Sequence, residues 1–149
     1  MTYYEIAVRP VYLSASDEVA VRLGSGRRPR SAASTLRGDV QACLDPGGRL
    51  VRLLLADSKI LHLGQRLAGL PVVEHPLDPT PSGVIGYDLA ARVATLFLFP
   101  TPDSLIVQRV VRSANLDFDA NERLLAVRIP AGATARRESD LYSALAFLR

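Results

Sequence analysis

Acidic side chains at alternate positions near the end of the chain have the spacing with which a calcium loop begins. Asp117, Asp119 and Asn121 supply oxygen atoms at the first, third and fifth positions of such a loop. The later positions do not fit, because Glu122 replaces the glycine of the sharp turn and Arg128 stands in place of the bidentate glutamate. We therefore interpret Asp117 and Asp119 as residues that lie together on the solvent face of a strand, and we predict no metal site.

The histidines and the cysteine lack the neighbours that catalysis or metal binding requires. His62 and His75 are the only histidines, and neither has a second ligand at metal-binding spacing. Cys43 is the single cysteine, and its local sequence contains no histidine or cationic cluster that would lower the thiol pKa. Phosphate-binding loops and nucleophile elbows are also absent. The sequence thus predicts no catalytic residue and no cofactor, and an enzyme remains open only through residues that folding brings together.

Residues 24–38 form the most unusual segment, because they combine four arginines with no acidic residue. Their glycine, serine and proline content is typical of a flexible connection between strands. Basic loops bind phosphate groups when counterion release drives association, and a solvated surface loop is the alternative that we favour. The segment has no aromatic side chain to stack on a base. The candidate nucleic-acid-binding residues are Arg27, Arg28, Arg30 and Arg37.

A second candidate surface is apolar. Residues 93–99 are hydrophobic on both faces of a strand apart from Thr95, so this strand belongs at the centre of a sheet or at an interface. Residues 105–107 add further apolar side chains, more than one thin sheet can cover. The predicted protein interface consists of Val93, Phe97, Phe99, Leu105 and Val107.

Length and composition indicate one globular domain. The chain has 149 residues, of which 48% are hydrophobic and 22% charged, so an intrinsically disordered chain is excluded. The net charge of +3 is a mild positive bias, below that of a dedicated nucleic-acid binder. No apolar run approaches the ~20 residues of a membrane span, and the N-terminus predicts no signal peptide. With a single cysteine, we expect a cytoplasmic protein.

Hydrophobic residues alternate with polar ones along several segments, a pattern typical of strands with one buried face. Strands are expected at residues 19–23, 39–44, 49–55, 93–99, 114–119 and 124–129, with an N-terminal edge strand at 3–8. Residues 45–48 and 119–122 are predicted turns, with Asn121 as the left-handed residue of the second. Two helices are predicted by helical spacing, one after Asp57 and Ser58 through Leu70, the other after Ser139.

The two halves of the chain share a pattern at a shift of 74 residues. Residues 19–20 then fall on 93–94, Asp45 on Asp119, and 49–50 on 123–124. We predict a mainly β (α+β) fold of two β-meander-plus-helix repeats with antiparallel strands, packed as one pseudo-two-fold domain, with chance similarity as the alternative. The repeats span residues 1–70 and 84–149, and a proline-rich linker spans 71–83.

Residues 87–98 and 115–129 resemble the small bacterial domain-of-unknown-function 2283 family. The shared features are a Tyr87-Asp88 pair before a strand and an acidic strand that turns into an alternating Leu, Val and Ile strand. The likeness covers residues 85–130 and, more faintly, 11–56. It departs where residues 119–122 lack the usual turn glycine and where no aspartate follows Tyr12. The resemblance implies a tandem hairpin fold and carries no activity.

Three functions follow as hypotheses. The first is a small bacterial non-catalytic binding protein that associates with itself or with another protein. The second is a nucleic-acid-binding protein that uses the basic segment. The third is an enzyme in which Asp45, Asp117 and Asp119 converge, and a fold that separates these acids would exclude it.

Overall fold

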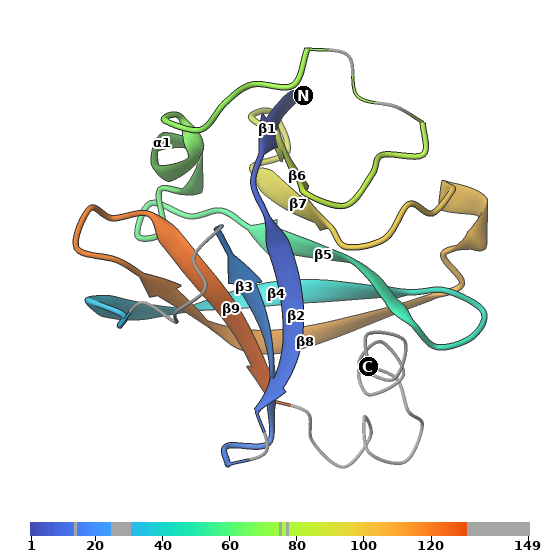
Figure 1. Ribbon diagram of the computed structural model, residues 1–149, viewed down its shortest axis with the longest axis horizontal. Coiled ribbons are helices and arrows are strands. Elements are labelled where there is room, and N and C mark those ends of the chain that lie inside the picture. Colours follow the sequence, from blue (N-terminus) through green and yellow to red (C-terminus); the bar gives the residue numbers. More distant parts are fainter. Residues whose placement is uncertain (14, 25–30, 75, 77, 131–149) are drawn as a thin grey trace.

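One antiparallel sheet of nine strands makes up most of the structure, a computed structural model that describes residues 1–13, 15–24, 31–74, 76 and 78–130 (Figure 1). The fold is therefore mainly β, as predicted. The strands are β1 (Thr2–Glu5), β2 (Val8–Leu13), β3 (Glu18–Leu23), β4 (Ser34–Leu44), β5 (Leu50–Ala56), β6 (Val84–Asp88), β7 (Val93–Phe97), β8 (Gln108–Phe118) and β9 (Leu124–Pro130). A short α-helix, α1 (Leu63–Leu67), and a 3₁₀ turn, η1 (Asp103–Leu105), complete it.

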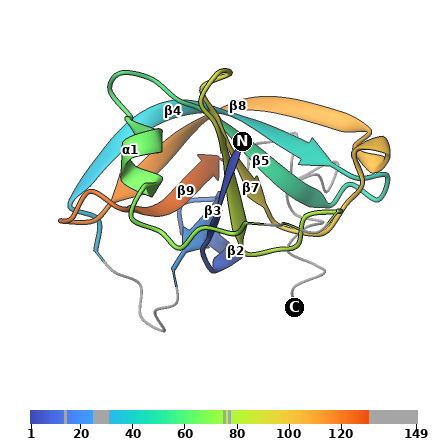
Figure 2. The ribbon, with the colours of Figure 1, turned by 90° about the horizontal axis from the view of Figure 1, so that it is seen from above.

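The sheet curls until its two ends meet. The strand order is β1-β6-β7-β5-β4-β8-β9-β3-β2, so β1 and β2 stand at opposite ends although only Ile6 and Ala7 separate them along the chain. The Ile6 amide donates to the carbonyl of Gly83 at 3.0 Å, and the Gly24 amide donates to that of Ala7 at 2.8 Å. Figures 1 and 2 show β1 and β2 following each other along this seam.

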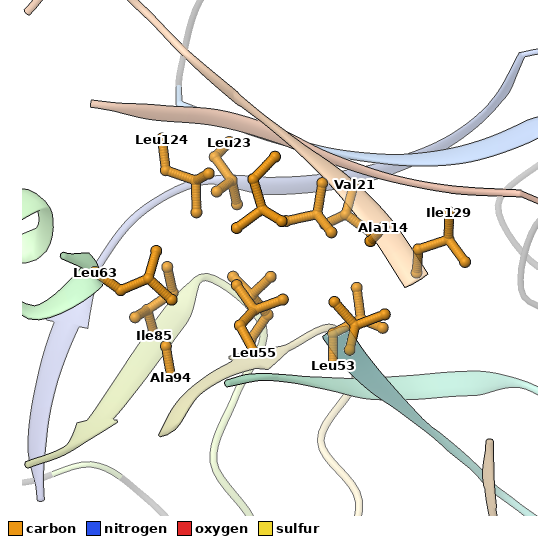
Figure 3. Packing of buried hydrophobic residues seen from close by; sticks show 14 of the residues in the cluster. Val21, Leu23, Leu53, Leu55, Leu63, Ile85, Ala94, Ala114, Leu124 and Ile129 are labelled. Carbon is orange, nitrogen blue, oxygen red and sulfur yellow. The ribbon is translucent and has the colours of Figure 1, made fainter. Parts of the chain in front are cut away.

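The inside of the curl holds the hydrophobic core. Alternate residues of each strand point inward, as period-two patterning requires, and Figure 3 shows side chains from opposite walls meeting in the middle. α1 adds Leu63 and Leu67 at one end, where it closes the core. Because the sheet faces itself, no second layer is needed to cover its apolar face. The largest fully buried residues include Leu44, Leu53, Leu55, Ile85, Leu96, Leu116, Phe118 and Ile129.

The two longest strands, β4 and β8, pair along their whole length of 11 residues. The pairing runs from Ser34 opposite Phe118 to Leu44 opposite Gln108, with Asp39 opposite Ser113 at its centre. Both strands have the same order of exposed and buried residues, and each ends in a bulge before its turn. Their first halves carry polar residues, so the predicted strands at 39–44 and 114–119 begin later than the observed ones.

An aspartate organises each of the two turns that follow these strands. Oδ1 of Asp45 accepts the amides of Gly47 at 3.0 Å and Arg49 at 2.9 Å. Oδ1 of Asp119 accepts the corresponding amides of residues 121 and 123 at 2.8 and 2.9 Å. The left-handed residue of the second turn is Glu122, with φ of 64°, so the prediction of Asn121 was wrong. Both carboxylates therefore serve as turn acceptors.

Helical structure is shorter than the sequence predicted. Only Leu63–Leu67 is helical in the first predicted helix, while Ile60 is 70% exposed and Leu70 is half-buried. The helix begins late because Asp57 and Ser58 accept backbone amides within a preceding turn, and His62 adopts φ of 49°. The predicted C-terminal helix lies outside the described residues. No helix in the described part of the chain is long and apolar enough to cross a membrane.

The proline-rich segment contributes to the sheet edge at its start. Tyr4 and Val72 form a bridge, and the Glu5 amide donates to the Pro71 carbonyl at 2.8 Å. This segment therefore covers the side of β1 that faces away from β6.

The turn geometry leads to a stability prediction. We expect Asp45→Ala and Asp119→Ala each to lower the free energy of unfolding by about 1 kcal/mol, because each change leaves two turn amides without their acceptor. Urea denaturation of each variant measures this loss. Asp39→Ala is the control, since that exposed carboxylate makes no hydrogen bond with another described residue. Equal stability of all three variants would contradict the assigned role of the aspartates.

Candidate functional site

A groove of about 710 Å³ runs over the outer face of β2, β3 and β9 and around the end of the sheet beside α1. Its volume is within the range of ligand-binding pockets. Small residues, Ala20 and Ala126, lie on neighbouring strands within it. Among the described lining residues acids are in the minority, since Glu5, Asp117 and Asp119 stand beside five arginines. We call this groove the arginine groove. Its described arginines are Arg9, Arg22, Arg66, Arg123 and Arg128.

Two of the groove arginines face each other directly. Arg9 of β2 pairs with Arg22 of β3, which places two positive side chains side by side on the outer face. Arg9 is exposed and Arg22 half-buried. Within the described part of the chain, neither side chain makes an ion pair or hydrogen bond. Like charges opposite each other destabilise a sheet, so this pair lowers stability unless an anion binds.

Arg128, by contrast, is fully engaged. Its Nε lies 2.7 Å from Oδ2 of Asp117 and its Nη2 2.9 Å from Oδ1, while Nη1 lies 3.3 Å from Glu18. Thr35 donates to the same Oδ1 of Asp117 at 2.7 Å. Hydrogen bonds to Asp117 are the main reason that the pKa of Arg128 is raised. This network ties β3, β4, β8 and β9 together beneath one wall of the groove.

Arg66 fixes α1 against the sheet. Its guanidinium stacks 3.9 Å from the centre of the Phe118 ring, donates to the Leu61 carbonyl at 2.6 Å and donates to the Glu122 carbonyl at 3.1 Å. Arg66 is therefore a structural member of the groove wall. The Arg123 side chain makes no such bond to the described residues, so Arg9, Arg22 and Arg123 are the arginines available to a ligand.

A second polar cluster joins Tyr87 to Asp57 at the edge of a 490 Å³ cavity. The Tyr87 hydroxyl donates to Oδ2 of Asp57 at 2.5 Å, and the amides of Leu63 and Gly64 donate to the same carboxylate at 2.8 and 3.4 Å. Burial alone would raise the pKa of Asp57, but the bonds from Tyr87 and the backbone outweigh it and hold that pKa below its ordinary value. The same bond, aided by burial, raises the pKa of Tyr87 to about 12.

Folding places two arginines beside the cysteine. Arg109 of β8 and Arg52 of β5 are the cross-strand neighbours of Cys43, and Nη1 of Arg109 lies 3.2 Å from its Sγ. Burial raises the thiol pKa more than the two guanidinium groups lower it. The thiol therefore stays neutral at pH 7 and is a poor nucleophile. The sequence missed these neighbours because they lie on other strands.

The predicted site residues fall into separate regions. Arg27, Arg28 and Arg30 lie outside the described residues, and Arg37 is exposed on the outer face of β4, donating to Ser113 at 3.3 Å. Of the predicted protein interface, Phe97 is only 7% exposed, so it offers little surface to a partner. Val93 and Phe99 are half-buried, while Leu105 and Val107 are 47% and 62% exposed.

The acids of the enzyme hypothesis do not converge. Asp45 follows β4 and Asp119 follows β8, and these strands are antiparallel over 11 residues, so their turns lie at opposite ends, about 30 Å apart. The hypothesis that Asp45, Asp117 and Asp119 converge is therefore wrong.

His75 lies outside the described residues, and no three histidine, cysteine or acidic side chains in the described segments are placed to hold a metal ion.

Comparison of the chain with protein-family models, curated proteins and solved structures finds no match in any of the three. The resemblance to the domain-of-unknown-function 2283 family therefore stays a prediction.

The Tyr87–Asp57 bond leads to a prediction at alkaline pH. Because the pKa of Tyr87 is raised from 10.0 to about 12, its contribution to stability is complete below pH 10 and is lost as the pH rises through about 12. We expect Asp57→Asn to move the tyrosinate titration of Tyr87 back towards 10, and Tyr87→Phe to remove this titration.

Spectrophotometric titration of the wild type and both variants measures the shift. A Tyr87 that titrates in the same range with and without the Asp57 carboxylate would contradict this assignment.

Proposed function

We propose that this protein is a small non-catalytic binding module that takes an anionic ligand in the arginine groove. The observation that carries the proposal is the direct opposition of Arg9 and Arg22 without an acidic partner in the described structure. A bound anion relieves their repulsion and forms charge-assisted hydrogen bonds to both. The pair is therefore explained by a ligand and not by the stability of the fold.

The carboxylates of the groove support a binding role over a catalytic one. Asp117 is held by Arg128 and Thr35, and Asp119 accepts two turn amides. A general acid or base needs a carboxylate that is free to exchange its proton with a substrate. These two acids are committed to structure instead. Glu5, the third described acid of the groove, is exposed and is outnumbered by the available arginines, so what the groove mainly offers a ligand is positive charge and shape.

Nucleic acid remains the alternative ligand. The segment with Arg27, Arg28 and Arg30 connects Gly24 to Ser31, and both Gly24 and Ala32 line the arginine groove. Basic residues that are clustered in the sequence, as these three are, favour a phosphate backbone. Among the described lining residues, however, no aromatic ring is present on which a base would stack. The alternative therefore rests on phosphate contacts alone.

A second candidate function is association with a protein, including another copy of this chain. It rests on Leu105, Val107 and Val111, which are 47%, 62% and 64% exposed within one short stretch before and along β8. Neighbouring exposed apolar side chains are typical of contact surfaces.

We place the protein in the cytoplasm, where the free Cys43 stays reduced.

We further propose that the chain arose by internal duplication. The strand order β6-β7-β5-β4-β8-β9-β3-β2 is symmetric about its centre, between β4 and β8. Each strand of the first half stands as far from this centre as its counterpart in the second half, with β2 matching β6, β3 matching β7, β4 matching β8 and β5 matching β9. The hairpin of β4 and β5 recurs 74 residues later in β8 and β9, with its bulge, and the register of β2 and β3 recurs in β6 and β7 at a shift of 75. These coincidences support a pseudo-two-fold axis between Asp39 and Ser113.

The anion proposal is tested with pyrophosphate by isothermal titration calorimetry at low salt. We expect the double variant R9S/R22S to bind at least tenfold more weakly than the wild type, because two charge-assisted bonds are lost. We also expect this variant to fold with unchanged or higher Tm, since the repulsion is removed. R37S/R112S is the matched control, with two arginines outside the groove. Equal weakening by both double variants would refute the groove as the site.

The association proposal is tested by sedimentation velocity over a range of protein concentrations. We expect self-association of the wild type, which V107S/V111S abolishes and L89S does not, because Leu89 is even more exposed, at 77%, but lies elsewhere. A wild type that remains monomeric throughout, and shows no dependence on these valines, counts against this surface as a contact between copies.

A further inference from the structure

One end of the arginine groove is apolar. Leu23 ends β3, Leu124 begins β9 and Leu67 ends α1, and all three belong to the hydrophobic core although they line the groove. Figure 3 labels Leu23 and Leu124 among the packed side chains of the core. Ile6, at the seam of the sheet, and Leu70 are half-buried and pack against the same core. Leu23, Leu67 and Leu124 are at most 7% exposed, so the apolar surface that the groove offers at this end comes from Ile6 and Leu70.

The cationic and apolar parts of the groove are neighbours along the same strands. Arg22 points outward and the next residue, Leu23, points inward at the end of the sheet. Arg9 follows Val8, which is paired with Leu23. Arg9 and Arg22 line the same groove as Ile6 and Leu70, so the positive pair and these apolar side chains border one continuous space around the end of the sheet.

From this arrangement we propose that the ligand is a single-chain anionic amphiphile, a small molecule with a phosphate or carboxylate head and an alkyl chain. This inference deepens the proposed function and rests on it. The head group lies between Arg9 and Arg22, and the chain lies over Leu70 and Ile6 towards the end of the core. The volume of 710 Å³ accommodates both parts.

Charge complementarity and the lining residues favour this occupant over a nucleic acid. An oligonucleotide uses positive charge together with stacking platforms, and the described lining contains no aromatic residue. A bound oligonucleotide would also leave the apolar end of the groove without a partner. An alkyl chain covers that end and gains affinity with every methylene group that it buries.

The experiment compares inorganic phosphate, butyl phosphate and octyl phosphate, each below its aggregation concentration, with an oligothymidylate as a competing probe. Calorimetry with the full chain measures each affinity. We expect affinity to rise roughly two- to fourfold for each added CH₂ that reaches the groove, and therefore more than tenfold from butyl to octyl phosphate. R9S/R22S should weaken all three phosphates.

Two half-buried leucines provide the matched variants. Leu70 lines the groove, whereas Leu54, also half-buried, lies on the outer face of β5 away from it. We expect Leu70→Ser to weaken octyl phosphate about tenfold and to leave inorganic phosphate unchanged, with Leu54→Ser affecting neither. The Tm of each variant verifies that it is folded.

The remaining outcomes separate the two proposals. If phosphate binding depends on Arg9 and Arg22 but octyl phosphate binds no more tightly than butyl phosphate, the amphiphile is overturned and the anion module stands. If the oligothymidylate binds through these arginines and octyl phosphate does not displace it, the occupant is a nucleic acid. If no probe depends on the two arginines, both proposals are wrong. Equal effects of Leu70→Ser and Leu54→Ser would also overturn the placement of the chain.

Discussion

The short link between β1 and β2 constrains the whole molecule. Ile6 and Ala7 carry the chain from one end of a nine-stranded sheet to the other, which is possible only if those ends are adjacent. The sheet therefore has to curl, and its apolar face packs against itself instead of against a layer of helices. With α1 as the one described helix, almost all chemically active side chains lie on the outer face or at the ends of the curl.

On that outer face, the side chains of the neighbouring strands determine whether an arginine forms an ion pair. Arg128 meets Asp117 and Glu18 on adjacent strands and becomes the centre of an ion-pair network. Arg22, two strands from Asp117, meets Arg9 instead. The first arrangement stabilises the sheet, while the second opposes it. A repulsive pair that persists on a regular part of the sheet points to a role outside folding, as strained or unsatisfied groups do at functional sites.

The sequence predicted the parts of the fold that depend on local pattern. Alternation located the strands around residues 19–23 and 49–55, and the proline and glycines of residues 45–48 marked the turn before the second of them. Alternation did not predict the first halves of β4 and β8, because these segments are rich in polar residues and are stabilised as strands by pairing with each other. The sequence did not predict the candidate sites for a related reason. Asp57 and Tyr87 are 30 residues apart in the sequence. Arg9 and Arg22 become neighbours only through the register of the two strands that carry them.

The proposed duplication bears on the groove as well. At a shift of 75 residues, Arg9 corresponds to Val84 and Arg22 to Phe97, which are likewise paired across two strands. Both of these residues are buried, and Tyr3 lies near the Phe97 ring. The same hairpin geometry thus accepts apolar residues at these positions without loss of the fold. Since the backbone does not require arginine there, the charged pair in the first half is better explained by the ligand that we propose for it, in a groove that residues of the second half also line.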